Sequence, residues 1–135
     1  MLGIVLVSHG GMADGMISTA KMLYPDLSQV KSLTLWPEDN PDDFQAKLEV
    51  IVKEVDSGEG VFILADLLGG TPCNRAVYFM SDKVRLITGL SLPLLISLLS
   101  QREDGTDIET LAHDIMDDAA AGMVDVNEIL KKRGN

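Results

Sequence analysis

Short, almost wholly apolar runs alternate along the chain with longer amphipathic segments, and this alternation narrows the possible folds more than any other feature. Four of the runs have the length of a β-strand: Leu2–Ser8, Val30–Trp36, Val61–Ala65 and Val84–Thr88. Strands that are apolar along their whole length are typical of a parallel sheet covered by helices on both faces. The order of segments therefore predicts an α/β fold with a doubly wound, mostly parallel sheet, flavodoxin-like and with strand order 2-1-3-4.

Helices are predicted in the segments between and after these runs, where apolar residues recur at helical spacing. The predicted helices are Asp14–Leu23, Asn40–Val55, a helix opened by Gly69–Pro72 and running to about Met80, one from Pro93 to about Arg102, and Thr106–Ala120. Asn40 has the side chain of an N-cap, and Thr106 with Glu109 forms the pattern of a capping box. The segment Met123–Val126 is predicted to be a short strand before a last helical turn at Glu128–Lys132.

Composition and charge limit the classes of function. No linker or repeat interrupts the pattern, so residues 1–135 are predicted to form a single domain. The net charge of −10 makes nucleic acid and anionic membrane surfaces poor partners, whereas a basic protein face would be attracted. No apolar run approaches the ~20 residues of a membrane span, and the N-terminus lacks the basic region of a signal peptide. We therefore expect a cytoplasmic protein without membrane insertion.

Two polar residues mark the ends of apolar runs. His9 follows the first run, and Asp66 follows the third. In strand order 2-1-3-4 the first and third strands are neighbours, so both side chains are predicted to meet in one crevice at the carboxyl edge of the sheet. A carboxylate that accepts one ring N–H fixes the tautomer of an imidazole and leaves the other ring nitrogen free as a nucleophile.

Glycine-rich turns follow the same two strands. In Gly69–Pro72 the paired glycines let the backbone approach a ligand, while Thr71 is predicted to be the N-cap of the next helix. Gly10–Gly11 gives the first helix a similar open start. Free N–H groups and a hydroxyl at a helix start bind phosphoryl oxygens, so Gly10, Gly70 and Thr71 are candidate phosphoryl-binding residues. Together with His9 and Asp66 they predict a site for a phosphorylated histidine.

Other sites find less support in the sequence. No standard nucleotide-binding loop and no nucleophile elbow is present. A single cysteine and two histidines form no ligand cluster, so we expect no metal site. His113 is interpreted as an exposed helix residue and Cys73 as a small buried one. The pattern leaves open whether Trp36 lines the crevice.

Two motifs resemble those of a known family. They are His9-Gly10-Gly11 after the first strand and the run from Asp66 to Asn74, which reads Asp-Leu-Leu-Gly-Gly-Thr-Pro-Cys-Asn. Thr88–Pro93 after the fourth strand extends the similarity over nearly the whole chain. The sequence resembles the mannose-family (mannose, fructose and sorbose) IIA component of the bacterial phosphoenolpyruvate-dependent sugar phosphotransferase system.

The resemblance implies a phosphocarrier without cofactor or metal. The phosphocarrier protein HPr would donate its phosphoryl group to Nε2 of His9, with Asp66 holding the other ring nitrogen and Thr71 helping to hold the phosphoryl group. His9 would pass the group to a histidine of a IIB component, and the IIC and IID membrane components would act only indirectly. The family also implies a homodimer in which the two subunits exchange a C-terminal strand. Because the sequence stops at Asn135, IIB is expected on a separate polypeptide.

Two alternatives remain at this point. One is a non-catalytic regulatory module that binds a partner according to its phosphorylation state. The other is the related domain of the multiphosphoryl subunit of a dihydroxyacetone kinase, although the Gly-Gly-Thr-Pro run differs from that group. The sequence does not indicate which sugar is transported.

Overall fold

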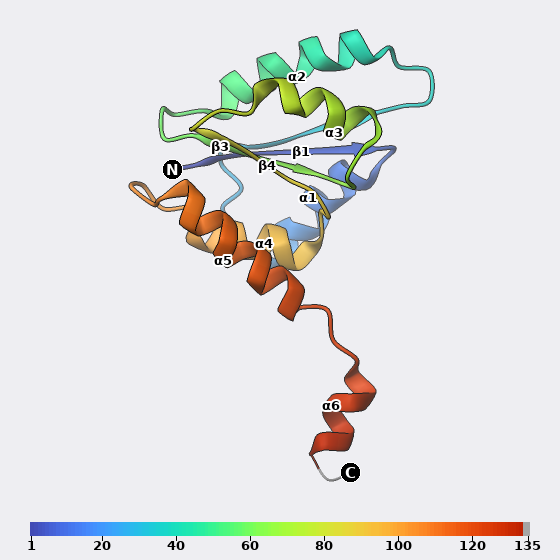
Figure 1. Ribbon diagram of the computed structural model, residues 1–135, viewed down its shortest axis with the longest axis vertical. Helices are drawn as coiled ribbons and strands as arrows, with labels where there is room; N and C mark the ends of the chain where they lie inside the picture. The colour runs from blue at the N-terminus through green and yellow to red at the C-terminus, as the bar shows by residue number, and fades with distance from the viewer. Residues whose placement is uncertain (134–135) are drawn as a thin grey trace.

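The computed structural model describes residues 1–133, and its centre is a four-stranded parallel sheet (Figure 1). The strands are β1 (Gly3–His9), β2 (Val30–Leu35), β3 (Val61–Ala65) and β4 (Val84–Ile87). They lie in the order β2-β1-β3-β4, which confirms the predicted order 2-1-3-4. All four strands run in one direction, so the residues that follow β1, β2 and β3 gather at one edge of the sheet.

Helices cover both faces of the sheet, as predicted for a doubly wound fold (Figure 1). One face carries α2 (Pro41–Val55) and α3 (Gly70–Ala76), which continues into the short 3₁₀-helix η1 (Val77–Phe79). The other face carries α1 (Met12–Leu23), α4 (Leu92–Gln101) and α5 (Ile108–Ala121).

The side chains of β1 divide the core into two layers. Ile4 and Leu6 pack with α1, α4 and α5, whereas Val5 and Val7 pack with α2 and α3. All four are fully buried, because a central parallel strand is covered on both faces. This double burial explains why the strand appears in the sequence as an almost continuous apolar run.

The start of α5 differs from the predicted capping box. The N-cap of α5 is Asp107, whose carboxylate accepts the N–H of Thr110 at 3.1 Å, and the hydroxyl of Thr106 bonds to the carbonyl of Glu103 instead. The helix therefore starts one residue later than the predicted capping box. Asn40 caps α2 as predicted, with its side chain accepting from the backbone N–H of residue 42 at 2.7 Å.

The start of α3 also corrects the sequence analysis. Thr71 is not the N-cap, because Gly69 occupies that position and the helix begins at Gly70. Both glycines have positive φ, +85° and +76°, which favours glycine strongly over other residues. Pro72 is tolerated in the first helical turn, where backbone N–H groups have no partner within the helix.

The C-terminal segment differs most from the prediction. Residues 123–125 form no strand, and α6 (Val126–Lys132) follows. Asp125 caps α6 by accepting the N–H of Glu128 at 3.3 Å, and a strand needs a neighbouring strand, which this segment does not have within residues 1–133. The helical turn predicted at Glu128–Lys132 lies within α6. In Figure 1 this helix stands away from the body of the molecule.

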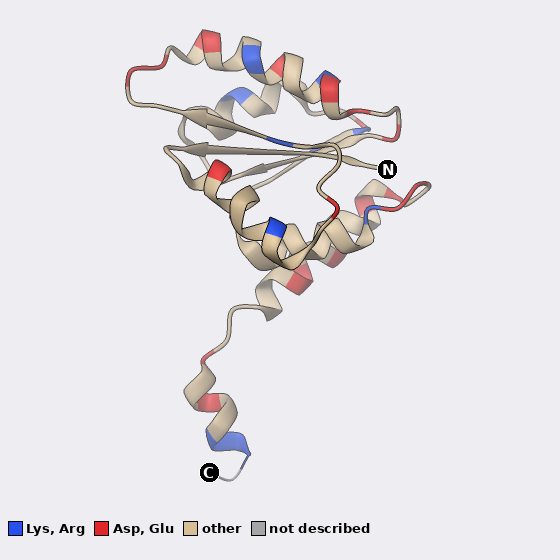
Figure 2. Ribbon diagram, turned by 180° about the vertical axis from the view of Figure 1, so that it is seen from behind, with Lys and Arg blue, Asp and Glu red and all other residues tan. Residues whose placement is uncertain are grey.

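Acidic residues are spread over the helices and loops of both layers (Figure 2). None of the helices within residues 1–133 has the length and apolar character needed to cross a membrane.

Candidate active site

The predicted pair of polar side chains is present at the carboxyl edge of the sheet. His9 is the last residue of β1 and Asp66 follows β3, the adjacent strand. The Nδ1 atom of His9 lies 2.7 Å from Oδ2 of Asp66, and the backbone N–H of His9 donates to the same oxygen at 2.9 Å. The other carboxylate oxygen accepts the N–H of Leu67 at 2.9 Å. Asp66 therefore holds both the backbone and the ring of His9.

The hydrogen bonds around Asp66 determine the ionisation of its carboxyl group and the tautomer of the His9 ring. Burial alone would raise the pKa of Asp66, but hydrogen bonds from the N–H and ring of His9 and from the N–H of Leu67 outweigh it and lower the pKa below its ordinary value. An ionised carboxylate only accepts hydrogen bonds, so the ring proton resides on Nδ1 and Nε2 keeps its lone pair. The Asp66 side chain is 8% exposed and that of His9 47%, so the free nitrogen belongs to an accessible ring.

Gly70 packs against the free edge of the His9 ring. A Cβ atom on Gly70 would lie 2.8 Å from Cε1 and 3.1 Å from Nε2 of His9. The first residue of α3 thus contacts the ring beside Nε2, and glycine is required there by space as well as by its positive φ.

A crevice of about 410 Å³ opens beside the ring. It is lined by His9, Gly10, Leu35, Trp36, Pro37, Asp39 and Thr71. Trp36 therefore lines the crevice, which the sequence had left open. No side-chain hydrogen bond within residues 1–133 involves the hydroxyl of Thr71, so this group is available to a ligand. All five residues predicted from the sequence lie together at this edge.

Ser8 is a residue of the site that the sequence analysis missed. Its fully buried hydroxyl accepts the N–H of Ala13 at 2.8 Å and donates to the carbonyl of Gly10 at 3.3 Å. The N-cap of α1, Gly11, has no side chain that can cap the helix, and Ser8 takes over this role from the strand. It was detectable as the polar residue that interrupts the apolar run just before His9.

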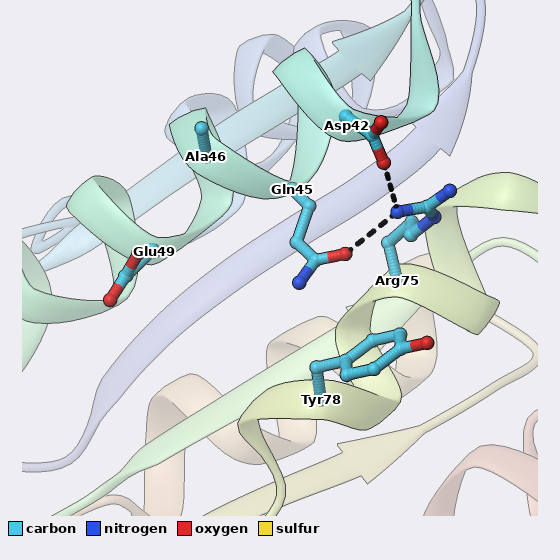
Figure 3. A pocket seen from close by; sticks show the side chains of 6 residues that line it. All are labelled: Asp42, Gln45, Ala46, Glu49, Arg75 and Tyr78. Carbon is cyan, nitrogen blue, oxygen red and sulfur yellow. Dashed lines mark hydrogen bonds and ion pairs between the residues drawn. The ribbon is translucent and has the colours of Figure 1, made fainter.

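Arg75, four residues after Thr71 in the chain, points into a separate cleft (Figure 3). Its Nη1 donates to Oδ1 of Asp42 at 2.7 Å and to Oε1 of Gln45 at 2.9 Å. These residues line a separate cleft of about 400 Å³ between α2 and the α3–η1 segment, with Tyr78 on its other side. Among the described residues, those lining the His9 crevice include no Lys or Arg.

Cys73 and His113 are placed as the sequence predicts. Cys73 is buried in α3, and His113 is exposed on α5. Within the described part of the chain, no three or more His, Cys, Asp and Glu side chains are grouped so that they would hold a metal ion.

Fold and site together define a doubly wound α/β protein whose sheet edge presents a carboxylate-oriented histidine. The sequence family described as "PTS system fructose IIA component" (EIIA-man) matches residues 3–116. The chain belongs to this family, the mannose-type EIIA components of the sugar phosphotransferase system.

Individual relatives agree with this assignment. The sorbose-specific EIIA component of Klebsiella pneumoniae is 31% identical over 104 residues, which cover 76% of each protein. The mannose-specific EIIAB component of Escherichia coli K12 is 30% identical over 112 residues, 82% of this chain but only 35% of the relative. The chain thus spans about a third of the length of the EIIAB relatives.

Solved structures share the fold. The IIA protein associated with the fucose utilization operon of Streptococcus pneumoniae matches with a TM-score of 0.80, 32% identity and 95% coverage of both chains. The mannose/sorbose-specific IIA subunit of Enterococcus faecalis matches with a TM-score of 0.81, 28% identity and coverage of 92% and 93%.

Proposed function

We propose that the chain is a phosphocarrier in which His9 accepts a phosphoryl group from phospho-HPr and passes it to a histidine of a IIB component for sugar uptake. The observation that carries the proposal is the 2.7 Å contact between Nδ1 of His9 and Asp66 on a ring that is 47% exposed. This contact leaves Nε2 free as the nucleophile, at a crevice open to a partner protein.

In the proposed step, the Nε2 lone pair of His9 attacks the phosphorus of the donor phosphohistidine. A new N–P bond forms as the donor's N–P bond breaks, and the bonding electron pair returns to the donor imidazole. The ring of His9 then carries positive charge with its proton still on Nδ1. The Asp66 carboxylate stabilises that charge, as it is already in place before the reaction.

Gly10, Gly70 and Thr71 are proposed to hold the phosphoryl group. Gly70 contacts the ring beside Nε2, and the hydroxyl of Thr71 lines the same crevice. No guanidinium or ammonium lines the crevice among residues 1–133. Because charged donors bind a phosphoryl dianion most tightly, a site of neutral donors favours release to the next carrier.

The remaining partners belong to the same proposal. The IIC and IID membrane components act downstream, and the chain works in the cytoplasm as a homodimer that exchanges its C-terminal segment. The exposed Ile129 and Leu130 of α6 support such an exchange, because an exposed apolar helix face gains free energy by packing on another surface.

Intact-mass measurement tests the transfer. The chain is incubated with phosphoenolpyruvate, enzyme I and HPr, and we expect an acid-labile gain of one phosphoryl group that His9→Ala abolishes. Adding a cognate IIB should remove the label from the wild-type chain. Labelling of His9→Ala at the wild-type level contradicts the proposal, and a label that no IIB removes favours the regulatory module.

A further inference from the structure

Arg75 links helix α3 to helix α2 through two hydrogen bonds (Figure 3). Its Nη1 donates to Oδ1 of Asp42 at 2.7 Å and to Oε1 of Gln45 at 2.9 Å. We call these two bonds the α2–α3 link. Within residues 1–133, the cleft around the link and the crevice beside His9 have no lining residue in common. Any effect of Arg75 on His9 is therefore indirect.

Helix α3 has little in its own sequence that fixes its position. It has seven residues, and a helix of this length is marginal without support from its surroundings. Its N-cap is Gly69, which has no side chain to cap the first turn. The buried residues of α3 are small and bury little apolar area; they are Pro72, Cys73 and Ala76. A contact with a better anchored element is thus expected to matter for the position of α3.

Helix α2 is such an anchored element. It has fifteen residues, and the side chain of Asn40 caps its start by accepting the N–H of residue 42 at 2.7 Å. Four of its side chains are buried in the core layer that it shares with α3: Phe44, Leu48, Val52 and Val55. Asp42 and Gln45 lie near the capped end of this helix. The α2–α3 link therefore attaches α3 to a helix whose own position is set by packing.

The position of α3 matters at the ring of His9. Gly70 and Thr71 lie in the first turn of α3, and Arg75 follows about one helical turn later. A Cβ on Gly70 would lie 2.8 Å from Cε1 of His9, so the start of α3 is already in close contact with the ring. A misplacement of about 1 Å near reacting groups can slow a reaction by about 10²-fold. A small shift of α3 would thus alter the site.

We propose that Arg75 is a positioning residue, which sets Gly70 and Thr71 relative to Nε2 of His9 through the α2–α3 link. This inference rests on the proposed function, in which Gly70 and Thr71 hold the phosphoryl group. The Asp42 side chain is 83% exposed, and exposed ion pairs add little to stability. Loss of the link should therefore change the rate of phosphorylation more than the free energy of unfolding.

Arg75→Ala removes the link, and two donors test its effect on the rate. With phospho-HPr and with phosphoramidate, a small donor that needs no docking surface, we expect labelling of His9 to slow about tenfold. Lys31→Ala is the matched control, because it removes an exposed ion pair between β2 and α2, that of Lys31 with Glu54. The control should be labelled within about twofold of the wild-type rate by both donors.

Asp42→Ala separates position from charge. It breaks one bond of the link and leaves the positive charge of Arg75 without its partner. We expect labelling slower than in the wild type but faster than in Arg75→Ala, because Gln45 still accepts from Arg75. Combining both substitutions should slow labelling no further than Arg75→Ala alone, since the two residues act through one contact. Labelling faster than in the wild type would mean that Arg75 acts through its charge, which overturns the proposal.

Urea unfolding and circular dichroism of each variant show whether a slower rate reflects loss of folded protein. A wild-type rate in Arg75→Ala, or a fall no larger than its unfolded fraction, overturns the positioning role. A fall with phospho-HPr alone assigns Arg75 to donor contact and also overturns it. Failure of the wild-type chain to be labelled by either donor contradicts the proposed function itself.

Discussion

At the scale of single residues, the site depends on one carboxylate oxygen that holds His9 at two points. Oδ2 of Asp66 accepts from the backbone N–H and lies 2.7 Å from Nδ1 of the ring. The backbone bond fixes the carboxylate relative to β1, and the ring contact then fixes the direction of Nε2. An orientation built in this way needs no rearrangement when the donor arrives.

Replacing the Asp66 carboxylate by an amide tests what its negative charge contributes to the tautomer and reactivity of His9. In Asp66→Asn an N–H₂ group replaces one of two oxygens that each accept a backbone N–H, so the side chain holds the ring less firmly and the ring proton shifts to Nε2 in part of the molecules. We expect phosphorylation of His9 by phosphoramidate to slow by at least about tenfold. The ring tautomer is measured by ¹⁵N NMR, and an unchanged tautomer with an unchanged rate contradicts the role given to Asp66.

The lowered pKa of Asp66 also predicts how the free energy of unfolding depends on pH, and Asp66→Asn serves as the reference. The folded chain lowers the pKa of Asp66, so its ionised form adds stability above the unfolded pKa of about 3.9. This contribution is lost as the pH falls through the lower pKa of the folded state. The free energy of unfolding, measured in urea, should thus differ between wild type and Asp66→Asn by a constant amount from pH 6 to 7. This difference should shrink below about pH 4.

Other carboxyls with lowered pKa values, those of Asp26 and Asp107, are present in both proteins and cancel in the difference. A difference that grows on acidification contradicts the assignment.

Gly70→Ala tests the contact beside Nε2. The added Cβ would push the His9 ring away, and the positive φ adds about 1–2 kcal/mol of backbone strain. Gly69→Ala is the matched control, because its φ is also positive but a Cβ there meets nothing within 4 Å. Urea unfolding should show a loss of stability in both variants, with slower phosphorylation only in Gly70→Ala. Equal rates in the two would show that the contact has no effect.

His9 and Asp66 were predictable from the sequence because each directly follows an apolar run, and parallel strands end at one edge. Trp36, Asp39 and Leu35 were not predictable as crevice residues. Their place depends on the turn between Trp36 and Asp39, which has no short sequence signature. The N–H of Asp39 donates to the carbonyl of Trp36, and the N–H of Trp36 donates to the side-chain carboxylate of Asp39.

At the scale of elements, the bounds of the four sheet strands were predicted to within one residue. The helix bounds were predicted to within two residues except at the end of α3, which stops at Ala76 and continues as η1, and the strand predicted at Met123–Val126 is absent. The strands could be predicted because burial on both faces of the sheet requires a continuous apolar run in the sequence. The helix starts were harder, because Thr106 and Asp107 are both good N-caps and only packing decides between them. The cap of α1 was missed since it comes from Ser8, outside the usual positions.

Ser8→Ala should weaken the start of α1. It leaves the buried N–H of Ala13 without its acceptor, so we expect a loss of about 1–2 kcal/mol in the free energy of unfolding. Ser91→Ala, which removes the cap of α4, is the control with a similar loss. Amide exchange by NMR should accelerate at Ala13 only in Ser8→Ala. Unchanged exchange there means that another group caps the helix.

At the scale of the whole molecule, the body is closed around its two core layers while α6 stands apart (Figure 1). The helix has seven residues, a length at which an isolated helix is marginal in water. Val126, Ile129 and Leu130 are exposed on it at helical spacing. In the proposed homodimer this apolar face is covered by the second copy.

Sedimentation of the full chain tests that arrangement. We expect a dimer for the wild type and a shift toward monomer when Ile129→Ser and Leu130→Ser are combined, because the apolar face is the part that the second copy buries. The control combines Lys131→Ala and Lys132→Ala, which change the same helix at polar positions and should leave the dimer intact. The melting temperature should rise with protein concentration in the wild type and control, since association stabilises the folded state by mass action, and should lose this dependence in the serine variant. A monomeric wild type, or a serine variant that dimerises as tightly as the control, would show that α6 does not hold two copies together.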